Sequence, residues 1–359
     1  MKSRLGVVLV LFIALPPWVF ADFQYQETTK ITGGSIVQMM KVAGVFSKQA
    51  RQVTEPVTST VLVKGNRMAH IDANTTEIID LDKETITNID HQKKQYTVMT
   101  FEQMKQAMER AAAEARKRQA EQNQSNQPQN QAEMNFTVNV RSTGATKQVS
   151  GVDAKEAILT MAAEATDKQT GEKGALNITN DMWMAPAIPG YDEVRAFQRR
   201  FAEKMGTMFN QTLGSSLAAT NPAAAQGMGD LAKEMAKVQG MPVLQITRMG
   251  STADGKPLPA ASEAPLPDSS GPEMPSAGDV AKESVKSSIS SKIPGFGGFG
   301  RKKKQQEEPP KEADQKQQPT MMVLMETSME MGGFSSASID DARFQVPAGY
   351  KQIEARGKQ

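Results

Sequence analysis

The chain has 359 residues, no cysteine and a formal net charge of +2, and only 5% of its residues are aromatic. Without cysteine there are no disulfides and no thiol chemistry, so a hydrophobic core has to stabilise the fold. Apart from two basic residues near its start, the chain carries 40 basic and 40 acidic residues. Such a neutral chain lacks the positive field that nucleic-acid binding requires, and we expect no nucleic-acid partner.

The first 21 residues have the pattern of a secretory signal peptide. Lys2 and Arg4 precede an apolar run over residues 5–15, and Val19 and Ala21 stand where a signal peptidase needs small residues. The run is too short to cross a bilayer as a helix, which takes roughly 20 residues. We therefore expect cleavage after Ala21 and a periplasmic or secreted mature chain without a transmembrane span.

Residues 22–250 and 320–359 are predicted to form one domain built mainly of strands. A Thr-rich stretch at 23–32 is followed by short β-prone stretches, with turn residues about every 8 to 12 positions, as is typical of an antiparallel meander. The further strands that we predict are 57–64, 67–72, 77–81, 85–89, 95–99, 135–141, 147–151, 157–165, 176–184, 243–248, 321–331 and 342–346.

Three segments instead have the apolar spacing of helices. They are residues 101 to about 118, 192–205 and 228–238, and Thr100 with Gln103 forms a capping box before the first. Each can lay one apolar face on a sheet. Runs of strands interrupted by a few helices predict the α+β class, with one large antiparallel sheet.

Two polar tracts are predicted not to join the core. The Gln/Asn-rich stretch 119–131 is expected to be a linker, and the stretch 251–319, rich in Pro, Ser, Gly and Lys, a disordered insertion. The insertion contains four consecutive basic residues after a Gly- and Phe-rich stretch: Arg301, Lys302, Lys303 and Lys304. They are either a solvated charge run or a peripheral contact with an anionic envelope surface.

Several short motifs resemble those of a family of bacterial secreted proteins, the domain-of-unknown-function forty-four-twelve family. They are the hairpin sequence at 65–68, the segment 181–186 that leads through 188–191 into a predicted helix, and the closing segment 344–351. The fold of that family is similar to that of the periplasmic lipoprotein carriers (lipoprotein localization factor-like). The resemblance implies a strongly curved sheet, an incomplete barrel, with helices on its concave face and an apolar cavity for acyl chains. The two polar tracts are not part of the carrier pattern.

The 23 methionines suggest which residues would line such a cavity. In the predicted strand 321–331, alternation places Met321, Val323, Met325, Met329 and Met331 on one face, away from the acidic residues. Methionine is flexible and suits ligands of varied shape, although it also fills ordinary cores. The candidate cavity residues are Met104, Met108, Trp183, Phe197, Phe201, Met321, Val323, Met325, Met329 and Met331.

Enzyme chemistry has little support in the sequence. There are only two histidines, His70 and His91, and neither accompanies a Gly-x-Ser-x-Gly motif. A phosphate-binding Gly-x-x-x-x-Gly-Lys, a zinc signature and a complete calcium loop are also missing. We therefore expect no catalytic residue, no metal and no cofactor.

The sequence thus predicts an exported, non-enzymatic binding protein of the bacterial envelope. The favoured ligand is a lipid or lipoprotein acyl chain, with the protein acting as a carrier or sensor. Two alternatives remain open. Methionine pairs, such as Met182 with Met184 and Met329 with Met331, could bind copper(I) through their thioethers. Alternatively, the protein could be an interaction factor that acts through its insertion.

Overall fold

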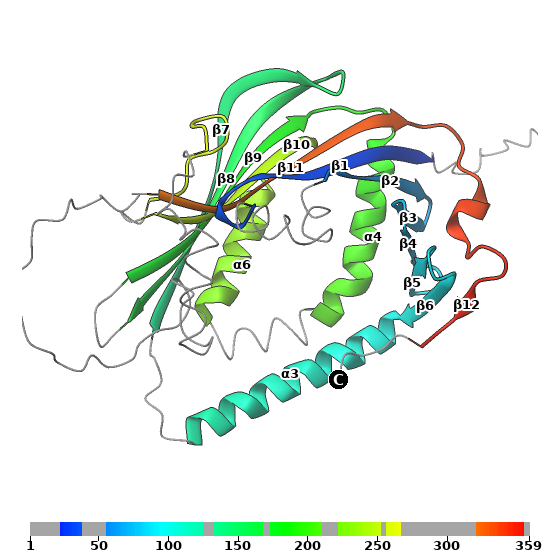
Figure 1. Cartoon of the computed structure of the whole chain (residues 1–359), viewed down its shortest axis with the longest axis horizontal. Coiled ribbons are helices and arrows are strands. Elements are labelled where there is room, and N and C mark those ends of the chain that lie inside the picture. Colours follow the sequence, from blue (N-terminus) through cyan, green and yellow to red (C-terminus); the bar gives the residue numbers. More distant parts are fainter. Residues whose placement is uncertain are drawn as a thin grey trace, which may run out of the picture.

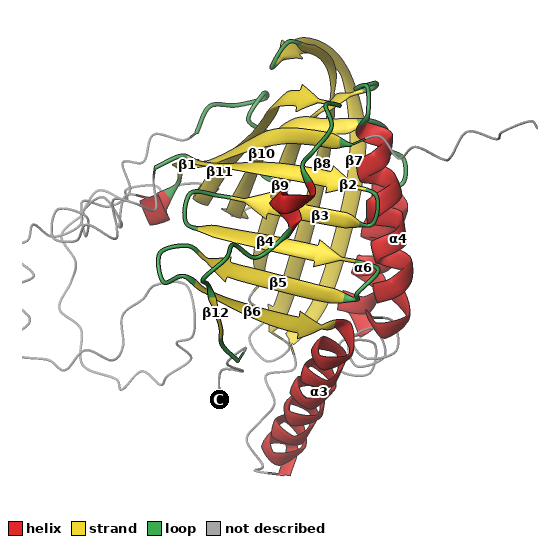
Figure 2. Cartoon of the chain, turned by 90° about the vertical axis from the view of Figure 1, so that its right-hand side faces the viewer, coloured by secondary structure: helices red, strands yellow, loops and turns green. Residues whose placement is uncertain are grey.

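The computed structural model describes residues 22–37, 55–124, 132–167, 173–209, 222–252, 256–266 and 321–354. The predicted signal peptide, most of the insertion and the basic run 301–304 lie outside these residues. The described strands form a single sheet of 12 strands in the order β12-β6-β5-β4-β3-β2-β1-β11-β10-β9-β8-β7. The sheet is strongly curved and its two edge strands, β12 and β7, do not meet (Figures 1 and 2).

All neighbouring strands are antiparallel except β12, which lies parallel to β6, so the sheet is mixed. The expected meander is present as β2 to β6, each strand paired with the next. Strand β1 joins this meander to the later strands because it pairs with both β2 and β11. The strand bounds are β1 Phe23–Gly33, β2 Val57–Lys64, β3 Arg67–Ile71, β4 Thr75–Asp80, β5 Thr85–Asp90, β6 Gln95–Thr100, β7 Ala132–Val149, β8 Val152–Asp167, β9 Lys173–Ala185, β10 Met241–Thr252, β11 Met321–Ser335 and β12 Lys351–Gln352.

Three helices, α3 (Phe101–Gln124), α4 (Tyr191–Phe209) and α6 (Pro222–Met235), correspond to the three predicted segments. The capping box before α3 is confirmed: the Gln103 amide N–H donates to Thr100 Oγ1 at 3.1 Å, and the Thr100 amide N–H donates to Gln103 Oε1 at 2.9 Å. Helix α3 continues to Gln124, into the predicted linker, because its Ala, Glu, Arg and Gln residues all favour a helix. Residues 125–131 of that linker lie outside the described part of the chain.

Helices α4 and α6 lie on the concave side of the sheet, which we call the inner face (Figure 1). Helix α4 covers the side near β1 and β2, where Val194 and Phe197 pack into the largest core cluster together with Phe23 and Tyr25. Helix α6 covers β7 and β8, where Leu231 packs against a second cluster. The two helices therefore close opposite parts of the inner face.

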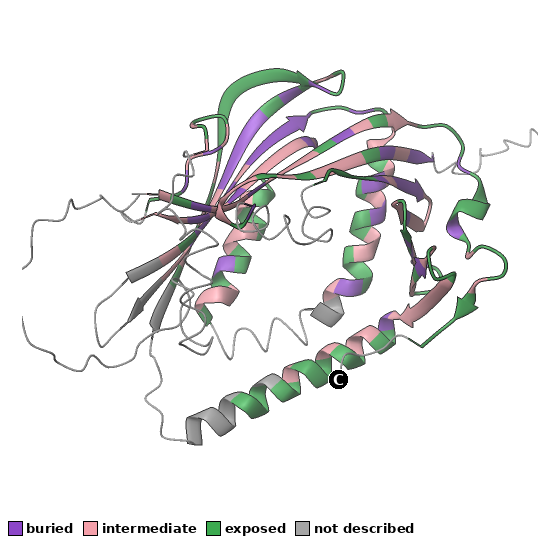
Figure 3. Ribbon diagram, in the orientation of Figure 1, coloured by how far each residue is buried: buried purple, intermediate pink, exposed green. Residues whose placement is uncertain are grey.

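The opposite face of the sheet, the outer face, is covered by chain without long helices (Figure 3). On β2 to β5, Leu62 and Ile78 pack with Ile339 and Phe344 of the C-terminal segment. The strand predicted at 342–346 is wrong, because residues Asp341–Phe344 form a 3-10 helix that Asp340 caps. In this conformation the segment can turn and place Phe344 on the sheet, which a straight strand would not allow.

The prediction of disorder from residue 251 onward is wrong at its beginning. Residues 251 and 252 still belong to β10, and residues 256–266, the outer strap, lie along the outer face (Figure 1, yellow). Leu258 and Ala260 of the strap are buried. The composition of the whole insertion misled the prediction, because it does not reveal that Arg248 of β10 binds the backbone of the strap. The Arg248 Nη1 donates to the carbonyl oxygens of Pro259, Ala260 and Ala264 at 2.8 to 3.1 Å.

Candidate functional site

The inner face is defined residue by residue through strand alternation. Met182 and Met184 of β9 pack in the same cluster as Leu231 of α6, so they point inward. Because successive side chains of a strand point to opposite faces, Ile178 also points inward, whereas Asp181 and Trp183 point outward. The same alternation applies along the neighbouring strands, because their residues are paired in register with those of β9.

Five strands place an apolar residue at the same height on the inner face. Met161 lies opposite Val138 on one side and Ile178 on the other, and Met249 lies between Ile178 and Met325. We call Val138, Met161, Ile178, Met249 and Met325 the inner row. All five side chains are partly exposed. The row therefore forms a continuous apolar band across β7, β8, β9, β10 and β11 that the described residues cover only in part.

A β-bulge in β11 changes the predicted face of two candidates. Met249 pairs with Met325, but the next residue of β10, Gly250, pairs with Val323, so Leu324 is the extra residue. The bulge reverses the alternation beyond this point. Val323 and Met321 therefore face outward, and Met322 takes the inward position. The prediction that all five apolar residues of this strand share one face is wrong for these two.

Burial along the inner face decreases toward one end of the strands. In β9, the exposed fraction of the side chain is 2% at Met182, intermediate at Ile178 and 40% at Leu176. In β11, it is 8% at Met331, intermediate at Met329 and Met325, and 43% at Met322. The inner face is thus closed by core packing near α4 and open at the other end, with the inner row between.

The remaining cavity candidates lie in or on the closed core. Phe197 and Met331 are buried in the cluster beneath α4, and Phe201 stacks on Phe197 with ring centroids 6.3 Å apart. Met104, Met108 and Met329 are partly buried against this cluster. Trp183 is also buried in this cluster, but strand alternation directs it away from the inner row, and the Lys147 ammonium lies 3.8 Å from its ring centroid. The candidates therefore do not form one lining, although Met325 and Met329 lie in or next to the inner row.

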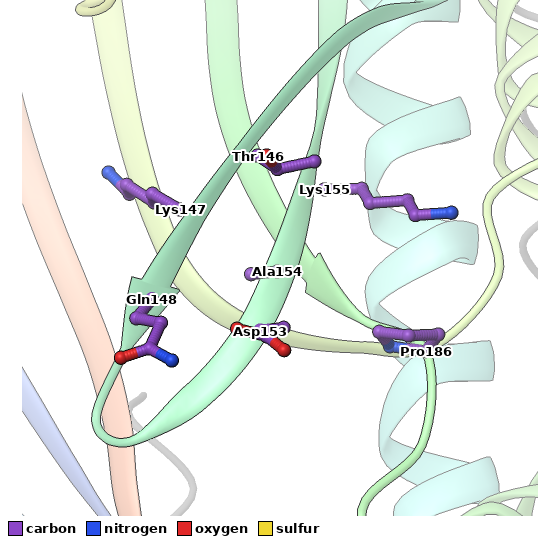
Figure 4. Close-up of a pocket in the computed structure, with 7 residues that line it drawn as sticks. All are labelled: Thr146, Lys147, Gln148, Asp153, Ala154, Lys155 and Pro186. Atoms are coloured by element: carbon purple, nitrogen blue, oxygen red, sulfur yellow. The ribbon is translucent and has the colours of Figure 1, made fainter.

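Three shallow pockets formed by described residues have volumes of about 450, 740 and 410 Å³. The first lies at the hairpin between β7 and β8, and Figure 4 shows its two lysines, Lys147 and Lys155, pointing in opposite directions. The second lies between α3, β6 and residues 352–354, and the third beside α4 near Arg200. None of the three is lined by an inner-row residue or by a cavity candidate. None brings together charges that would define a ligand.

Next to the inner row lies a short polar strip. The Asn180 Nδ2 donates to Gln245 Oε1 at 3.0 Å, and Gln245 Nε2 lies 3.7 Å from the Met329 sulfur. These side chains face inward because they alternate with the outward-facing Asp181 and Arg248 in their strands. The strip is uncharged, so the surroundings of the inner row can accept an apolar chain without burying an ion.

The two histidines have structural partners in the meander. His70 Nε2 lies 2.6 Å from Ser59 Oγ, and His91 lies 2.8 Å from Thr76 Oγ1 and 3.0 Å from the Tyr350 hydroxyl. Across the part of the chain that the structure describes, no group of three or more His, Asp or Glu side chains is placed to hold a metal ion. Of the proposed thioether pairs, Met182 and Met184 share the inner face and are buried.

The outer face beneath the strap is polar and buried. Arg248 Nε donates to Glu326 Oε2 at 2.7 Å, and both side chains are more than nine-tenths buried. Beside them, burial and the carboxylate of Glu156 raise the pKa of Asp181 to about 6. Burial alone would also raise the pKa of Glu156, but hydrogen bonds with Ser262, Thr143 and Asp181 hold it below its usual value. Below about pH 6, the two carboxyl groups thus hold one proton between them under the strap.

No protein-family model matches the chain, and the curated proteins contain no match either. Within the described ranges, no helix is both long enough and apolar enough to cross a bilayer.

Sequence reasoning missed four of the five inner-row residues: Val138, Met161, Ile178 and Met249. Each lies in or next to a strand that the sequence predicted, with period-two alternation. The signal that would have found them is the register of five strands, which joins residues nearly 190 positions apart. Local periodicity carries no information on that register.

Proposed function

We propose that the protein is an exported, non-enzymatic binding protein that holds the acyl chain of a lipid or lipoprotein against the inner row. The observation that supports this proposal is the band of five partly exposed apolar side chains in register across five strands. The proposal includes an incomplete barrel similar to that of the lipoprotein carriers, with a periplasmic or secreted location. It takes the role to be that of a carrier or sensor.

The dimensions of the inner row suit an acyl chain. Neighbouring strands lie about 4.8 Å apart, so the band from Val138 to Met325 is about 19 Å long. Each methylene removed from water contributes about 0.8 kcal/mol, and burying about eight of them would supply about 6 kcal/mol before the cost of immobilising the ligand. Three of the five side chains are methionines, whose flexible thioethers adapt to chains of different length and saturation.

The proposal is tested by a pair of matched double variants. In Met249→Gln/Met325→Gln, the two directly opposed methionines of the inner row are replaced by residues of similar length that carry an amide. We expect the affinity for a fluorescent fatty acid, measured by titration without vesicles, to fall at least about tenfold. The control Met99→Gln/Met235→Gln changes two methionines outside the row and should bind like the wild type.

Native mass spectrometry of protein purified from an envelope fraction provides the second readout. We expect an added mass that corresponds to a lipid in the wild type and in the control variant, and its loss in the inner-row variant. Uniformly ligand-free wild-type protein that also fails to bind the fluorescent fatty acid would show that the acyl-chain proposal is wrong. If copper(I) instead binds to the wild type and not to the inner-row variant, the row serves as a thioether metal site.

A further inference from the structure

The exposed apolar side chains of the protein are concentrated at one end of the sheet. Among the described residues, seven large hydrophobic side chains are exposed, and four of them lie toward the open end of the inner face. We call these four residues the apolar rim: Ile36, Leu176, Met228 and Met322. The other three are Val57 at the start of β2, Met235 at the end of α6 and Ile353 beyond β12.

The strand register places Leu176 and Met322 at the same height, on the two sides of Ser251. The neighbouring pairs Asn177 with Gly250 and Gly250 with Val323 continue the ladder, and one position further on, Ser251 pairs with Met322. Leu176 therefore lies on the other side of Ser251 from Met322. Both side chains point inward, one step beyond the inner row. The rim is thus the direct continuation of that row toward solvent.

The other rim residues reach the same end through packing. Gly227, which precedes Met228 in α6, is in close contact with Phe136 of β7, one row beyond the inner row. Gly34 has a positive φ of 104° and packs directly against the backbone of Leu324, which brings the following Ile36 to the start of β11.

The rim side chains are aliphatic or thioether, with none of the Trp, Tyr or Arg side chains that dominate protein–protein hot spots. A cluster of exposed apolar side chains marks a protein or membrane contact, and this composition favours insertion between acyl chains. An acyl chain held by the inner row would also leave the protein at the end of the sheet where the rim lies. Both observations favour a lipid surface over a protein groove.

The basic run 301–304, outside the described residues, bears on the charge of the surface that the rim would contact. Leu266, where the outer strap ends, contacts Gly33 at the end of β1, and Met321 begins β11, so both ends of the insertion lie beside the rim. In the sequence, Lys304 of the basic run precedes Met321 by 17 residues. A chain of that length spans at most about 60 Å. Four positive charges are therefore tethered within reach of any surface that the rim touches, which favours an anionic one.

We infer that the apolar rim docks on the surface of an anionic lipid bilayer, where it would load or release the acyl chain held by the inner row. The inference rests on the proposed function for its purpose, but the docking itself is a separate property of the rim. Ile36, Leu176 and Met322 would enter the boundary between head groups and acyl chains.

Co-flotation with vesicles tests the docking. We expect the wild type to float with vesicles of phosphatidylethanolamine and phosphatidylglycerol, and less with phosphatidylcholine alone. In Leu176→Gln/Met322→Gln, the bound fraction should fall at least about tenfold, because the inserting side chains become polar. The control Ile353→Gln changes a residue of similar exposure, 38%, away from the rim and should float like the wild type. All three replacements are at exposed positions, and thermal unfolding checks that each variant is folded.

The outcomes separate the docking from the acyl-chain proposal. If the rim variant loses flotation but still binds the fluorescent fatty acid in solution, the rim is a docking surface distinct from the ligand site. If the wild type does not float, or the rim variant floats as well as the wild type, the docking inference is wrong whatever the inner row binds. A concentration-dependent dimer that the rim variant abolishes would assign the rim to self-association and would also overturn the inference.

Discussion

Strands β9, β10 and β11 carry different kinds of side chain on their two faces, because alternate residues of each strand point to opposite sides. On the outer face, buried charged groups are matched to fixed partners, as in the Arg248–Glu326 ion pair and the carbonyl oxygens of the strap. On the inner face, the methionine and isoleucine side chains of the inner row remain partly exposed. A hydrogen-bonded network requires one geometry, whereas apolar side chains tolerate many. The outer face is therefore suited to stabilise the fold and the inner face to accept a ligand.

Among the variants that test this difference between the two faces, Arg248→Met should lower the free energy of unfolding most. The change leaves the Glu326 carboxylate buried without its partner and removes the donor of three strap carbonyl oxygens. We expect the free energy of unfolding to fall by about 3–5 kcal/mol in urea titrations. Arg141→Met provides the control, because its ion pair with Glu263 is exposed, and should cost about 1 kcal/mol or less. Equal losses in both variants would mean that burial does not distinguish the two pairs.

Leu258→Ala should have the next largest effect, because Leu258 is the largest fully buried side chain of the outer strap. Loss of its side chain leaves a cavity between strap and sheet, and we expect a cost of about 2–3 kcal/mol. Limited proteolysis should show faster cleavage within residues 256–266 than in the wild type. If the strap stays equally protected, its backbone hydrogen bonds alone hold it on the sheet.

The shared proton of Asp181 and Glu156 predicts a pH-dependent strap. The raised pKa of Asp181, about 6 in place of 3.8, means that its contribution is complete below about pH 4 and is lost as pH rises through 6. The lowered pKa of Glu156 acts in the opposite direction, and its contribution is lost only as pH falls below the usual range of glutamate. We therefore expect amide hydrogen exchange at residues 258–264, corrected for the intrinsic rate, to increase between pH 5 and pH 7.

Asp181→Asn is the control for this pH dependence. Asparagine keeps a hydrogen-bond acceptor for the Ser262 amide N–H, which lies 3.2 Å from Asp181 Oδ2, but it does not titrate. The corrected exchange in the strap should then be nearly the same at pH 5 and pH 7. An unchanged pH dependence in this variant would assign the effect to another group.

The smallest effect on stability is expected on the inner face. The Met249→Gln/Met325→Gln variant changes two partly exposed side chains, and we expect each replacement to change the free energy of unfolding by about 1 kcal/mol or less. Urea titration of the ligand-free protein checks this value. A loss as large as that of Leu258→Ala would indicate that the inner row is packed core, and would remove the main support for the ligand proposal.

Much of the local structure followed from the sequence because it depends on local interactions. The meander from β2 to β6 has turn residues at every connection, and its strands are predicted within one or two residues. The capping box at Thr100 fixes the start of α3. The predicted strand at 342–346 was wrong because its alternating apolar residues serve a short 3-10 helix that packs on a distant part of the sheet.

The candidate site was only partly predictable, and Met325 and Val323 illustrate the reason. Both lie an even number of residues after Met321, and period-two alternation therefore assigns them to one face. One extra residue in the ladder, Leu324, separates them onto opposite faces. A bulge depends on how β11 pairs with β10, which is a property of two segments together.

The sequence by itself predicted export from its N-terminal pattern. It also determined the α+β class and the positions of most strands and helices, because apolar periodicity and turn residues act over a few neighbouring positions. The tertiary structure decided which apolar residues meet. The inner row consists of residues from five strands between positions 138 and 325, and only the register of a curved sheet brings them to the same height and the same face.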